Sequence, residues 1–264
     1  MIFIKNKYNN ALVDDIEKVF WMKDISVIIP AKNEEKYISN TLKEVKRVFE
    51  KYGLRHEIVV VDDGSTDNTH KEALKTAKKI GDVRVVKKEN GGKGSALSHG
   101  FKYCSGKLVT FIDADLDLHP RQIPLFMDYM KKYDADVVVG SKRHPLSKIN
   151  YPLDRRILSQ AYQIIVRVLF NLNLTDTQAG LKLFKYEVLE DILPRVLCKK
   201  YAFDLELLVN ADHRGFKIVE APIELNWQRK LGRIALRDIG RIALDTAAIF
   251  YRLRIMHYYN GARA

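Results

Sequence analysis

The sequence predicts an α/β protein with one mostly parallel sheet and helices on its flanks. Short apolar runs alternate with charged segments of helical period over residues 25–143, as is typical of successive βαβ units. The 264-residue chain is 47% apolar and has no Pro/Gly/Ser-rich linker, so it can bury one sizeable core. One apolar run ends in closely spaced acids, and strands of open α/β sheets present their ligand-binding groups at such ends.

Strands and helices alternate regularly in the first half of the chain. Apolar runs bounded by turn residues predict strands, and the amphipathic segments between them predict helices. Pro30 closes the first strand, and Gly64-Ser-Thr-Asp67 turns the second strand into its helix. The expected strands are Ile25–Ala31, Glu57–Asp63, Val83–Lys87, Leu108–Asp113 and Ala135–Gly140, and the expected helices are Glu34–Tyr52, Asn68–Ile80, Gly94–Tyr103 and Pro120–Tyr133.

The second half is less regular. It predicts a long helix from Arg155, a loop over Asn173–Gly180, a helix over Phe203–His213, a strand over Lys217–Asn226 and a terminal helix after Arg233. Apolar spacing in the long helix predicts an inward face, and separate charged and apolar faces are expected in the terminal helix. The inward residues expected in the long helix are Ile157, Ala161, Ile164, Ile165 and Val168.

The charge of the chain favours polyanionic partners. Lys and Arg number 45 against 33 Asp and Glu, a net charge of +12, which suits phosphates, nucleic acid or an anionic membrane face. Between Gln228 and Arg254 the net charge is +5, so this segment could lie at a membrane surface. The alternative is an ordinary solvated helix face.

Two further features bear on the compartment. The longest stretch without charged residues, Ile157–Val166, has ten residues, whereas a spanning helix needs about 20, so no transmembrane helix is expected. Cys104 and Cys198 lack a metal-binding spacing, which predicts free thiols in a reducing compartment. The N-terminal residues are too polar for a secretory segment, and a cytoplasmic location is expected.

The most informative motif is the apolar run that ends in Asp113, Asp115 and Asp117. Alternate side chains of extended backbone point the same way, so Asp113 and Asp115 should project together from a strand tip. Carboxylate oxygens suit a hard divalent cation such as Mg²⁺. The motif therefore predicts a metal-dependent reaction on a phosphorylated substrate.

Two other motifs follow expected strands. Asp62 and Asp63 end the second strand, where a carboxylate can accept a hydrogen bond from the ring N–H of uracil or guanine; the alternative is a helix cap. Asn90-Gly-Gly-Lys93-Gly-Ser95 is a glycine-rich turn entering a helix, and its amides and Lys93 could face a phosphate. It lacks the P-loop spacing, and a plain turn is the alternative.

In order along the chain, these motifs resemble the inverting glycosyltransferases of family 2, which have a GT-A fold, and within them the dolichyl-phosphate hexose synthases. The resemblance spans about residues 25–227. The matching segments are Pro30-Ala-Lys-Asn-Glu34-Glu, Val61-Asp-Asp-Gly-Ser-Thr-Asp67, Gly92-Lys-Gly-Ser-Ala96, Asp113-Ala-Asp115-Leu, Gly140-Ser-Lys142, Asp176-Thr-Gln178-Ala-Gly-Leu-Lys-Leu-Phe184, Tyr201-Ala-Phe-Asp204-Leu-Glu206-Leu-Leu208 and Asn226-Trp227.

The resemblance implies roles for individual residues. Lys142 stands where the family usually has Arg, with Arg143 beside it, and Gly232-Arg-Ile-Ala-Leu replaces a common ending of the last motif. The implied nucleotide-sugar contacts are Pro30, Glu34, Asp62 or Asp63, Lys93 and Asp113; the metal contacts are Asp113, Asp115 and Asp117; the phosphate contacts are Lys142, Arg143, Arg155 and Arg229; the acceptor-side residues are Asp176, Gln178, Asp204 and Glu206.

The resemblance also implies an activity. It is the transfer of a hexose from UDP-glucose or GDP-mannose to dolichyl or polyprenyl phosphate with Mg²⁺ or Mn²⁺, by an enzyme peripheral on the cytoplasmic face of a membrane. The expected organisation is an N-terminal extension 1–24, a GT-A domain 25–232 with a nucleotide-binding half 25–143 and an acceptor half 144–232, and a basic amphipathic segment 233–264. The alternative acceptor is a hydroxyl of a soluble saccharide or a protein. A nucleic-acid-binding protein is disfavoured because no reader motif is present.

Overall fold

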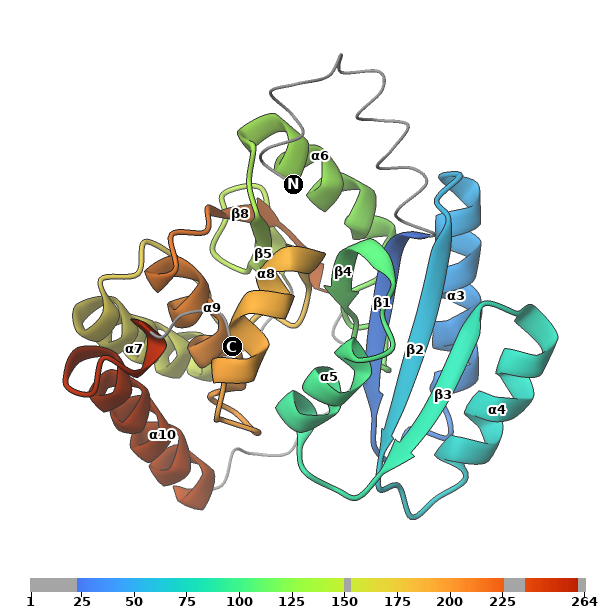
Figure 1. Cartoon of the computed structure of the whole chain (residues 1–264), viewed down its shortest axis with the longest axis horizontal. Helices are drawn as coiled ribbons and strands as arrows, with labels where there is room; N and C mark the ends of the chain where they lie inside the picture. The colour runs from blue at the N-terminus through green and yellow to red at the C-terminus, as the bar shows by residue number, and fades with distance from the viewer. Residues whose placement is uncertain (1–22, 150–152, 226–235, 261–264) are drawn as a thin grey trace.

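The computed structural model describes residues 23–149, 153–225 and 236–260. A seven-stranded sheet with the order β3-β2-β1-β4-β7-β5-β8 forms its centre, and helices cover both faces (Figure 1). Every neighbouring pair is parallel except the two pairs made by β7, which runs antiparallel to β4 and β5. The predicted α/β class with a mostly parallel sheet is confirmed.

The first half follows the predicted alternation, with boundaries that differ by a few residues. The largest difference is α3, which begins four residues later than expected because Tyr37 and Ile38 donate their amides to the Glu34 carbonyl in a turn before the helix. The elements are β1 (Lys23–Ala31), α3 (Ile38–Lys51), β2 (His56–Asp63), α4 (Thr69–Ile80), β3 (Val83–Lys88), α5 (Lys93–Phe101), β4 (Gly106–Phe111), η1 (Pro120–Gln122), α6 (Ile123–Tyr133) and β5 (Val137–Ser141).

The second half contains elements that the sequence did not predict. A four-residue strand, β7, enters the main sheet, and β6 pairs with β9 in a separate two-stranded sheet. The strand expected over Lys217–Asn226 is divided into β8 and β9. The elements are β6 (Lys148–Ile149), α7 (Leu153–Phe170), β7 (Lys182–Lys185), α8 (Tyr186–Ile192), η2 (Leu193–Arg195), α9 (Phe203–His213), β8 (Ile218–Pro222), β9 (Glu224–Leu225), α10 (Leu236–Arg254) and η3 (Tyr258–Asn260).

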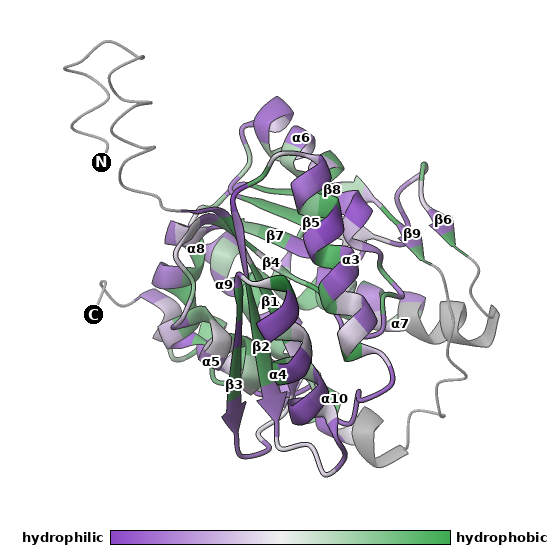
Figure 2. Ribbon diagram, turned by 90° about the vertical axis from the view of Figure 1, so that its right-hand side faces the viewer, coloured by the Kyte–Doolittle hydropathy of each residue, from purple (hydrophilic) through white to green (hydrophobic). Residues whose placement is uncertain are grey.

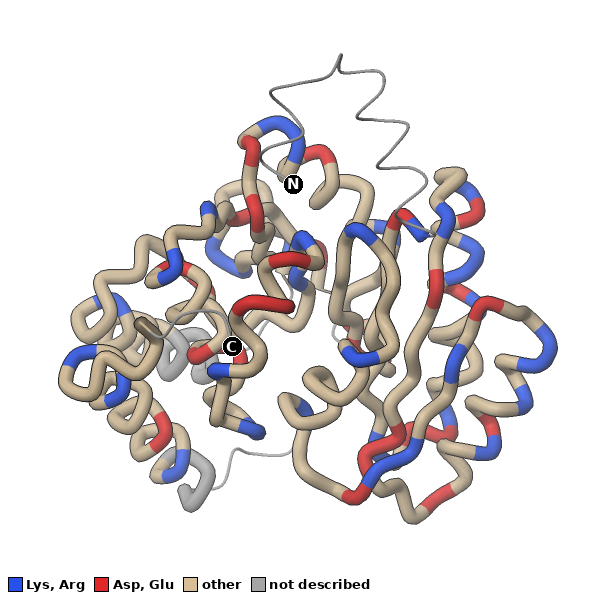
Figure 3. The backbone as a smooth tube through the Cα atoms, in the orientation of Figure 1, with Lys and Arg blue, Asp and Glu red and all other residues tan. Residues whose placement is uncertain are grey.

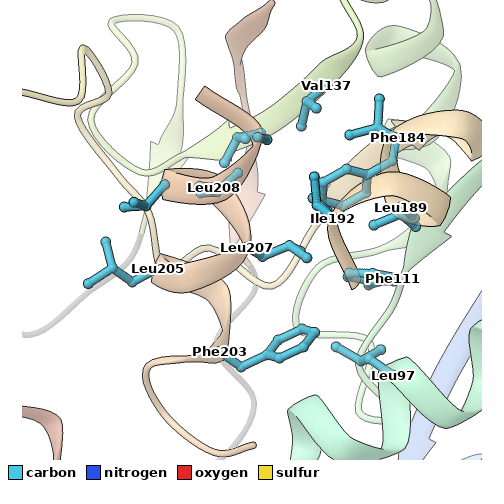
Figure 4. Packing of buried hydrophobic residues seen from close by; sticks show 14 of the residues in the cluster. Leu97, Phe111, Val137, Phe184, Leu189, Ile192, Phe203, Leu205, Leu207 and Leu208 are labelled. Carbon is cyan, nitrogen blue, oxygen red and sulfur yellow. The ribbon is translucent and has the colours of Figure 1, made fainter. Parts of the chain in front are cut away.

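Two apolar clusters hold the helices on the sheet. Alternate side chains of a strand point to opposite faces, so Ile28 of β1 joins one cluster while Val27 and Ile29 join the other. The first cluster packs α5, α7, α8, α9 and α10 against the sheet, and the second packs α3, α4 and α6. Figure 2 shows the apolar strands between these layers, and Figure 4 shows the first cluster around Phe111, Phe184 and Phe203.

The inward face predicted for α7 is wrong in its described part. Ile164, Ile165 and Val168 are exposed, whereas Val166 and Phe170 are buried in the core. The helix carries apolar residues on two faces, so the sequence spacing was compatible with burying either face. The contacts with the core bury the face of Val166 and Phe170. None of the helices in the described residues is long and apolar enough to cross a bilayer.

Candidate functional site

The candidate site lies at the carboxyl edge of the sheet. Strands β1, β2, β4 and β5 all end there because they share one direction, and antiparallel β7 begins there beside the end of β4, with Lys182 opposite Phe111. Acidic and basic segments of the backbone gather at this end of β2 and β3 (Figure 3). The topology therefore brings the loops after four strands to one place, as expected for a ligand site in an α/β sheet.

The loops after β1 and β2 are joined by side-chain hydrogen bonds. The Asn33 amide donates to Ser65 Oγ at 3.0 Å, and the Thr66 amide donates to Asn33 Oδ1 at 2.9 Å. Asn33 has a φ of 57°, a left-handed conformation that Asn adopts more readily than most residues. The Glu34 amide donates to Thr69 Oγ1 at 2.6 Å. This network fixes the backbone that carries the predicted nucleotide contact Glu34, next to Pro30 at the end of β1.

Asp62 and Asp63 have different surroundings. Asp63 Oδ1 accepts hydrogen bonds from Lys88 Nζ at 2.7 Å and from the Gly91 amide at 2.9 Å, and its Oδ2 accepts from the Gly92 amide at 2.8 Å. Asp62 is wholly buried, and its Oδ1 accepts from the Ser65 amide at 2.9 Å. Asp62 Oδ2 forms no hydrogen bond among the described residues, and His70 Nδ1 lies 3.4 Å from it. Asp63 therefore holds the glycine turn, while Asp62 keeps an acceptor oxygen.

The charge on Asp63 is stabilised by its partners. Burial opposes ionisation, but the Lys88 ammonium and the two glycine amides outweigh it and hold the pKa of Asp63 below its usual range. The glycine turn thus rests on an ionised carboxylate at the end of β2.

Lys93 begins α5 directly after the glycine turn and reaches the acidic loop after β4. Its Nζ lies 2.5 Å from Asp113 Oδ1. Loss of water from around Lys93 opposes its charge, but the carboxylates of Asp113, Asp204 and Asp115 raise its pKa above the usual range. The structure therefore brings three predicted acidic residues close to the predicted phosphate-facing lysine.

The loop after β4 is held in a defined shape. Thr41 of α3 donates its hydroxyl to the Ala114 carbonyl at 2.6 Å, and the Asp117 amide donates to Asp115 Oδ1 at 3.1 Å. Leu116 between them has a φ of 62°. Asp113 is packed against Gly180, where a methyl group on the glycine would overlap Asp113 Oδ2. The loop over Asn173–Gly180 and the acidic loop therefore lie in direct contact.

The donor set of the acidic loop fits a divalent cation shared with a substrate. The described residues contain no group of three or more His, Cys, Asp or Glu side chains placed to hold an ion by themselves. Mg²⁺, however, is commonly bound by one or two carboxylates together with substrate phosphates and water. Asp113 and Asp115 are half-buried and supply two such carboxylates.

Lys142 and Arg143 follow β5 and hold the predicted acceptor loop. Lys142 donates its amide and its Nζ to Asp176 Oδ2 at 3.0 and 2.8 Å. Burial opposes the charge of Asp176, but Lys142 and the backbone amides lower its pKa. Arg143 Nη1 donates to the Thr175 carbonyl at 2.5 Å, and the Gln178 amide donates to Asp176 Oδ1 at 3.0 Å in an Asx turn. The Gln178 side chain is exposed.

The two predicted acids of α9 lie in different places. Asp204 Oδ1 accepts from Lys182 Nζ at 2.6 Å, and Lys182, which is wholly buried, also donates to the Ala179 carbonyl at 2.6 Å. The Asp204 carboxylate is also close enough to Lys93 to raise the pKa of the lysine. Asp204 therefore belongs to the same polar cluster as Asp113.

Glu206 is wholly buried on the other side of α9. Its Oε2 accepts from the Leu197 and Cys198 amides at 2.9 and 2.6 Å, and its Oε1 accepts from Arg252 at 2.8 Å and from the Tyr259 hydroxyl at 2.6 Å. Helical residues two positions apart point about 200° away from each other, so α9 directs Glu206 away from Asp204. Its carboxylate joins α9, the segment before it and the C-terminal helix.

Arg155 lies on α7, and nothing is described for its side chain; Arg229 and Arg233 lie outside the described residues. Three residues of the site region were not predicted. Lys88 and Lys182 support Asp63 and Asp204, and the Lys199 carbonyl accepts from the Gly94 amide at 3.0 Å. A single lysine in a highly charged sequence gives no signal of a special role. Lys182 was an exception, because it lies inside the apolar segment Leu181-Lys-Leu-Phe184, and a charge buried in a core needs a partner.

Comparisons with known proteins find relatives along most of the chain. A profile described as glycosyl transferase family 2 matches residues 26–193. The chain is 32% identical to a dolichyl-phosphate beta-glucosyltransferase of Saccharomyces cerevisiae over 259 residues, covering 90% of this chain and 76% of the yeast protein. It is 31% identical over 245 residues to dolichyl-phosphate beta-glucosyltransferase ALG5D of Trichomonas vaginalis, covering 88% and 75%.

Solved structures share the fold. Glucosyl-3-phosphoglycerate synthase of Mycobacterium tuberculosis, in a complex with Mn²⁺, UDP and phosphoglyceric acid, is 23% identical with a TM-score of 0.67 and covers 87% of this chain and 78% of its own. A complex of that synthase with Mg²⁺ and UDP gives a TM-score of 0.64 at 21% identity and covers 92% and 83%. The predicted GT-A architecture is therefore confirmed.

Proposed function

The chain belongs to glycosyl transferase family 2, and from this we propose that it transfers glucose from UDP-glucose to dolichyl or polyprenyl phosphate. The observation that carries the proposal is the similarity to two dolichyl-phosphate beta-glucosyltransferases over about nine-tenths of the chain. The acidic loop with Asp113 and Asp115 at the carboxyl edge of the sheet supports it, because it lies where such a fold receives a nucleotide.

The donor would lie across the loops after β1, β2 and β4. Asp62 Oδ2 would be the acceptor for the uracil N–H, since it forms no hydrogen bond among the described residues and its nearest basic group is His70 Nδ1 at 3.4 Å. The amides of Gly91, Gly92 and Gly94 are engaged by Asp63 and by the Lys199 carbonyl, so Lys93 at the start of α5 is the group that would face the diphosphate. Guanine also carries a ring N–H, so the choice of UDP-glucose over GDP-mannose depends on the named relatives.

Asp113 and Asp115 would hold Mg²⁺ or Mn²⁺ together with the diphosphate. When bound, such a cation supplies Lewis-acid stabilisation of the negative charge on the leaving group. Lys93, whose ammonium lies 2.5 Å from Asp113, adds a second positive charge at the same place. Its short contact with Asp113 keeps both side chains oriented before the substrate arrives, which reduces the reorganisation that the reaction requires.

The acceptor needs positioning more than it needs a base. A phosphate monoester has its second pKa near 6, so the attacking oxygen of a lipid phosphate is already anionic at neutral pH. Asp204 is held by Lys182 at 2.6 Å, which suits an orienting role. The loop with Asp176 and Gln178 touches Asp113 through Gly180, so it can place the acceptor beside the donor sugar. We assign Arg155 and Arg229 to phosphate recognition.

One observation favours a second candidate, transfer to a hydroxyl of a soluble saccharide or a protein. Asp204 is 14% exposed and belongs to the polar cluster around Lys93 and Asp113, where a carboxylate can serve as a general base. The two candidates differ in the variant Asp204→Asn. We expect Asp204→Asn to keep much of its turnover if the acceptor is a phosphate and to lose nearly all of it if the acceptor is a hydroxyl.

A panel of radiolabelled nucleotide sugars tests the proposal. Each donor is incubated with polyprenyl phosphate, with and without Mg²⁺ or Mn²⁺, and the product is extracted into organic solvent. We expect label from UDP-glucose in the organic phase only when lipid phosphate and a divalent cation are both present. Label that stays in water with every donor, while soluble sugars become labelled, contradicts it.

We further propose that the chain works as a peripheral protein at the cytoplasmic face of a membrane, because its lipid acceptor is confined there. The division into a nucleotide-binding half 25–143, an acceptor half 144–232 and a basic segment 233–264 is part of the same proposal, with residues 1–24 as an extension.

A further inference from the structure

Two helices on one flank of the molecule present apolar side chains to solvent. On α7 these are Ile164, Ile165 and Val168, which are 65%, 51% and 77% exposed. On α10 they include Leu244 at 73% and Tyr251 at 53%, followed by the exposed Ile255 and Met256 after the helix. Single exposed apolar residues are common, but a group of large ones on neighbouring helices marks an interaction site.

The two helices lie side by side and share one core (Figure 1). The Tyr162 hydroxyl lies 3.1 Å from Thr246 Oγ1, and the rings of Phe170 and Phe250 meet edge to face with centroids 6.3 Å apart. Since their inner faces pack on the same cluster, their outer faces are neighbours. We call this outer face the α7–α10 surface, formed by Ile164, Ile165, Arg167, Val168, Arg241, Leu244, Tyr251, Arg254, Ile255 and Met256.

The α7–α10 surface is positively charged. Arg167, Arg241 and Arg254 are exposed on it, and none forms an ion pair with another residue in the described parts of the chain. Asp245, on the side of α10, is half-buried, and no Asp or Glu among the described residues of the two helices is exposed. The surface therefore combines large apolar groups with arginines that have no ion-pair partner among the described residues.

We propose that the α7–α10 surface docks on an anionic lipid bilayer. Apolar side chains flanked by arginines are what an interfacial helix needs, because the apolar groups enter the acyl boundary while the guanidinium groups meet lipid phosphates. A second copy of the chain fits less well, because each copy carries a net charge of +12 and a two-fold contact would place the same arginines opposite one another.

The proposal deepens the proposed function and rests on it for its biological purpose, since a lipid-borne acceptor must be met at the membrane. Contacts inside the protein connect the surface to the site. Arg252 on the inner side of α10 bonds Glu206, whose carboxylate holds the amide of Cys198. The carbonyl of the next residue, Lys199, accepts from the amide of Gly94 at the start of α5, directly after the glycine turn. Docking through α10 would therefore hold the glycine turn at a fixed position relative to the bilayer.

Vesicle sedimentation with the full chain tests the docking surface. Vesicles of phosphatidylcholine alone are compared with vesicles that also contain phosphatidylglycerol, and binding to the anionic vesicles is expected to be stronger. Replacing Arg241 and Arg254 by Gln should lower that binding about 25-fold, since each arginine near an anionic surface contributes roughly fivefold. Replacing Ile164, Val168 and Leu244 by Ser should lower it at least about 100-fold.

A matched control removes apolar groups elsewhere. Leu125 and Leu146 are 39% and 69% exposed on a different part of the molecule, so their double replacement by Ser should bind anionic vesicles as the unmodified chain does. Equal binding to both vesicle types, unchanged binding of the triple Ser variant, or an equal loss in the control would overturn the proposal. So would light scattering that finds a dimer which the triple Ser variant separates.

A second readout separates this proposal from the proposed function. Transfer to a short-chain polyprenyl phosphate in detergent does not require a bilayer, so the triple Ser variant should retain it. If the unmodified chain binds anionic vesicles and transfers no sugar to any lipid phosphate, the proposed function fails and the docking surface stands. If it transfers sugar to the short acceptor and ignores vesicles, only the docking surface is wrong.

Discussion

Replacing Arg252 by Met tests the buried carboxylate that joins the C-terminal helix to the core. Glu206 is wholly buried and accepts four hydrogen bonds, and Arg252 supplies the only cation among its described partners. Methionine keeps most of the side-chain length and removes the charge. Removing one partner of a buried ion pair leaves the other charge uncompensated, at a cost of about 3–5 kcal/mol.

The loss is large enough to measure by thermal unfolding. For a chain of this size, each kcal/mol corresponds to roughly 2–4 °C in Tm, so Arg252→Met should melt roughly 6–20 °C below the unmodified protein. Arg254, two residues further along α10, is exposed and provides the control, because Arg254→Met should stay within about 0.5 kcal/mol. Tyr259→Phe removes one hydrogen bond to Glu206 and should cost about 1–3 kcal/mol.

The same variant should weaken the donor site without touching it. Glu206 holds the amides of Leu197 and Cys198, and the Lys199 carbonyl accepts from the Gly94 amide at the start of α5. Arg252→Met should therefore raise the KM for the nucleotide sugar at temperatures where the variant is still folded. Equal melting temperatures for Arg252→Met and Arg254→Met would refute the reasoning, because the buried carboxylate would then not need its cation.

Three further predictions concern the site. Asp113→Asn should lower sugar transfer at least about 100-fold and weaken Mn²⁺ binding in the presence of UDP, measured by initial rates and calorimetry. Gly180→Ala should reduce turnover roughly 10-fold to 100-fold, because its methyl group displaces the Asp113 carboxylate. Asp63→Asn should flatten the acid dependence of Tm. Burial raises the pKa of Asp63, but Lys88 and the glycine amides lower it by more. The ionised Asp63 therefore stabilises the fold above about pH 4, and this stabilisation is lost as the pH falls through the lowered pKa.

A control variant checks the glycine prediction, and each of the three predictions has an outcome that would contradict it. Gly240→Ala places a methyl group in open space on α10, so it should leave turnover unchanged and stabilise the helix by about 0.5–1 kcal/mol. Unchanged turnover in Gly180→Ala would show that Asp113 does not need its position. Mn²⁺ affinity retained in Asp113→Asn would place the cation elsewhere. Parallel acid curves for the unmodified protein and Asp63→Asn would contradict an ionised Asp63 in the fold.

The sequence predicted the elements whose patterns are local. Runs such as Val59-Val-Val61 before an acid have a period and an end that depend on neighbouring residues alone, and the first five strands were found close to their observed bounds. β7 was missed because four residues headed by a buried Lys182 show no strand pattern, and their place between β4 and β5 depends on contacts distant in sequence. The exposed face of α7 was misassigned for a similar reason, since Ile164 and Val166 are equally apolar.

The candidate site was predictable where chemistry and position coincide. Asp113 and Asp115 follow a strand and occupy the sheet edge, as expected. The division of labour between Asp62 and Asp63 and the separation of Asp204 from Glu206 were not predictable, because both depend on partners such as Lys88 and Arg252 from distant segments. The members of each pair are close in sequence, so the same role was expected for both. The fold shows that the two carboxylates of each pair contact different neighbours.

The antiparallel strand β7 has a consequence for how the chain is made. Within the sheet, β5 pairs only with β7 and β8, and Thr110 of β4 meets Lys182 across 72 residues. While the ribosome has delivered only the first 143 residues, β4 has an open edge and β5 has nothing to pair with. Such non-local closure slows folding and leaves strand edges exposed to other chains. Synthesis of the nascent chain must therefore proceed past residue 185 before this edge is protected, and a fragment ending at 143 should aggregate when expressed alone.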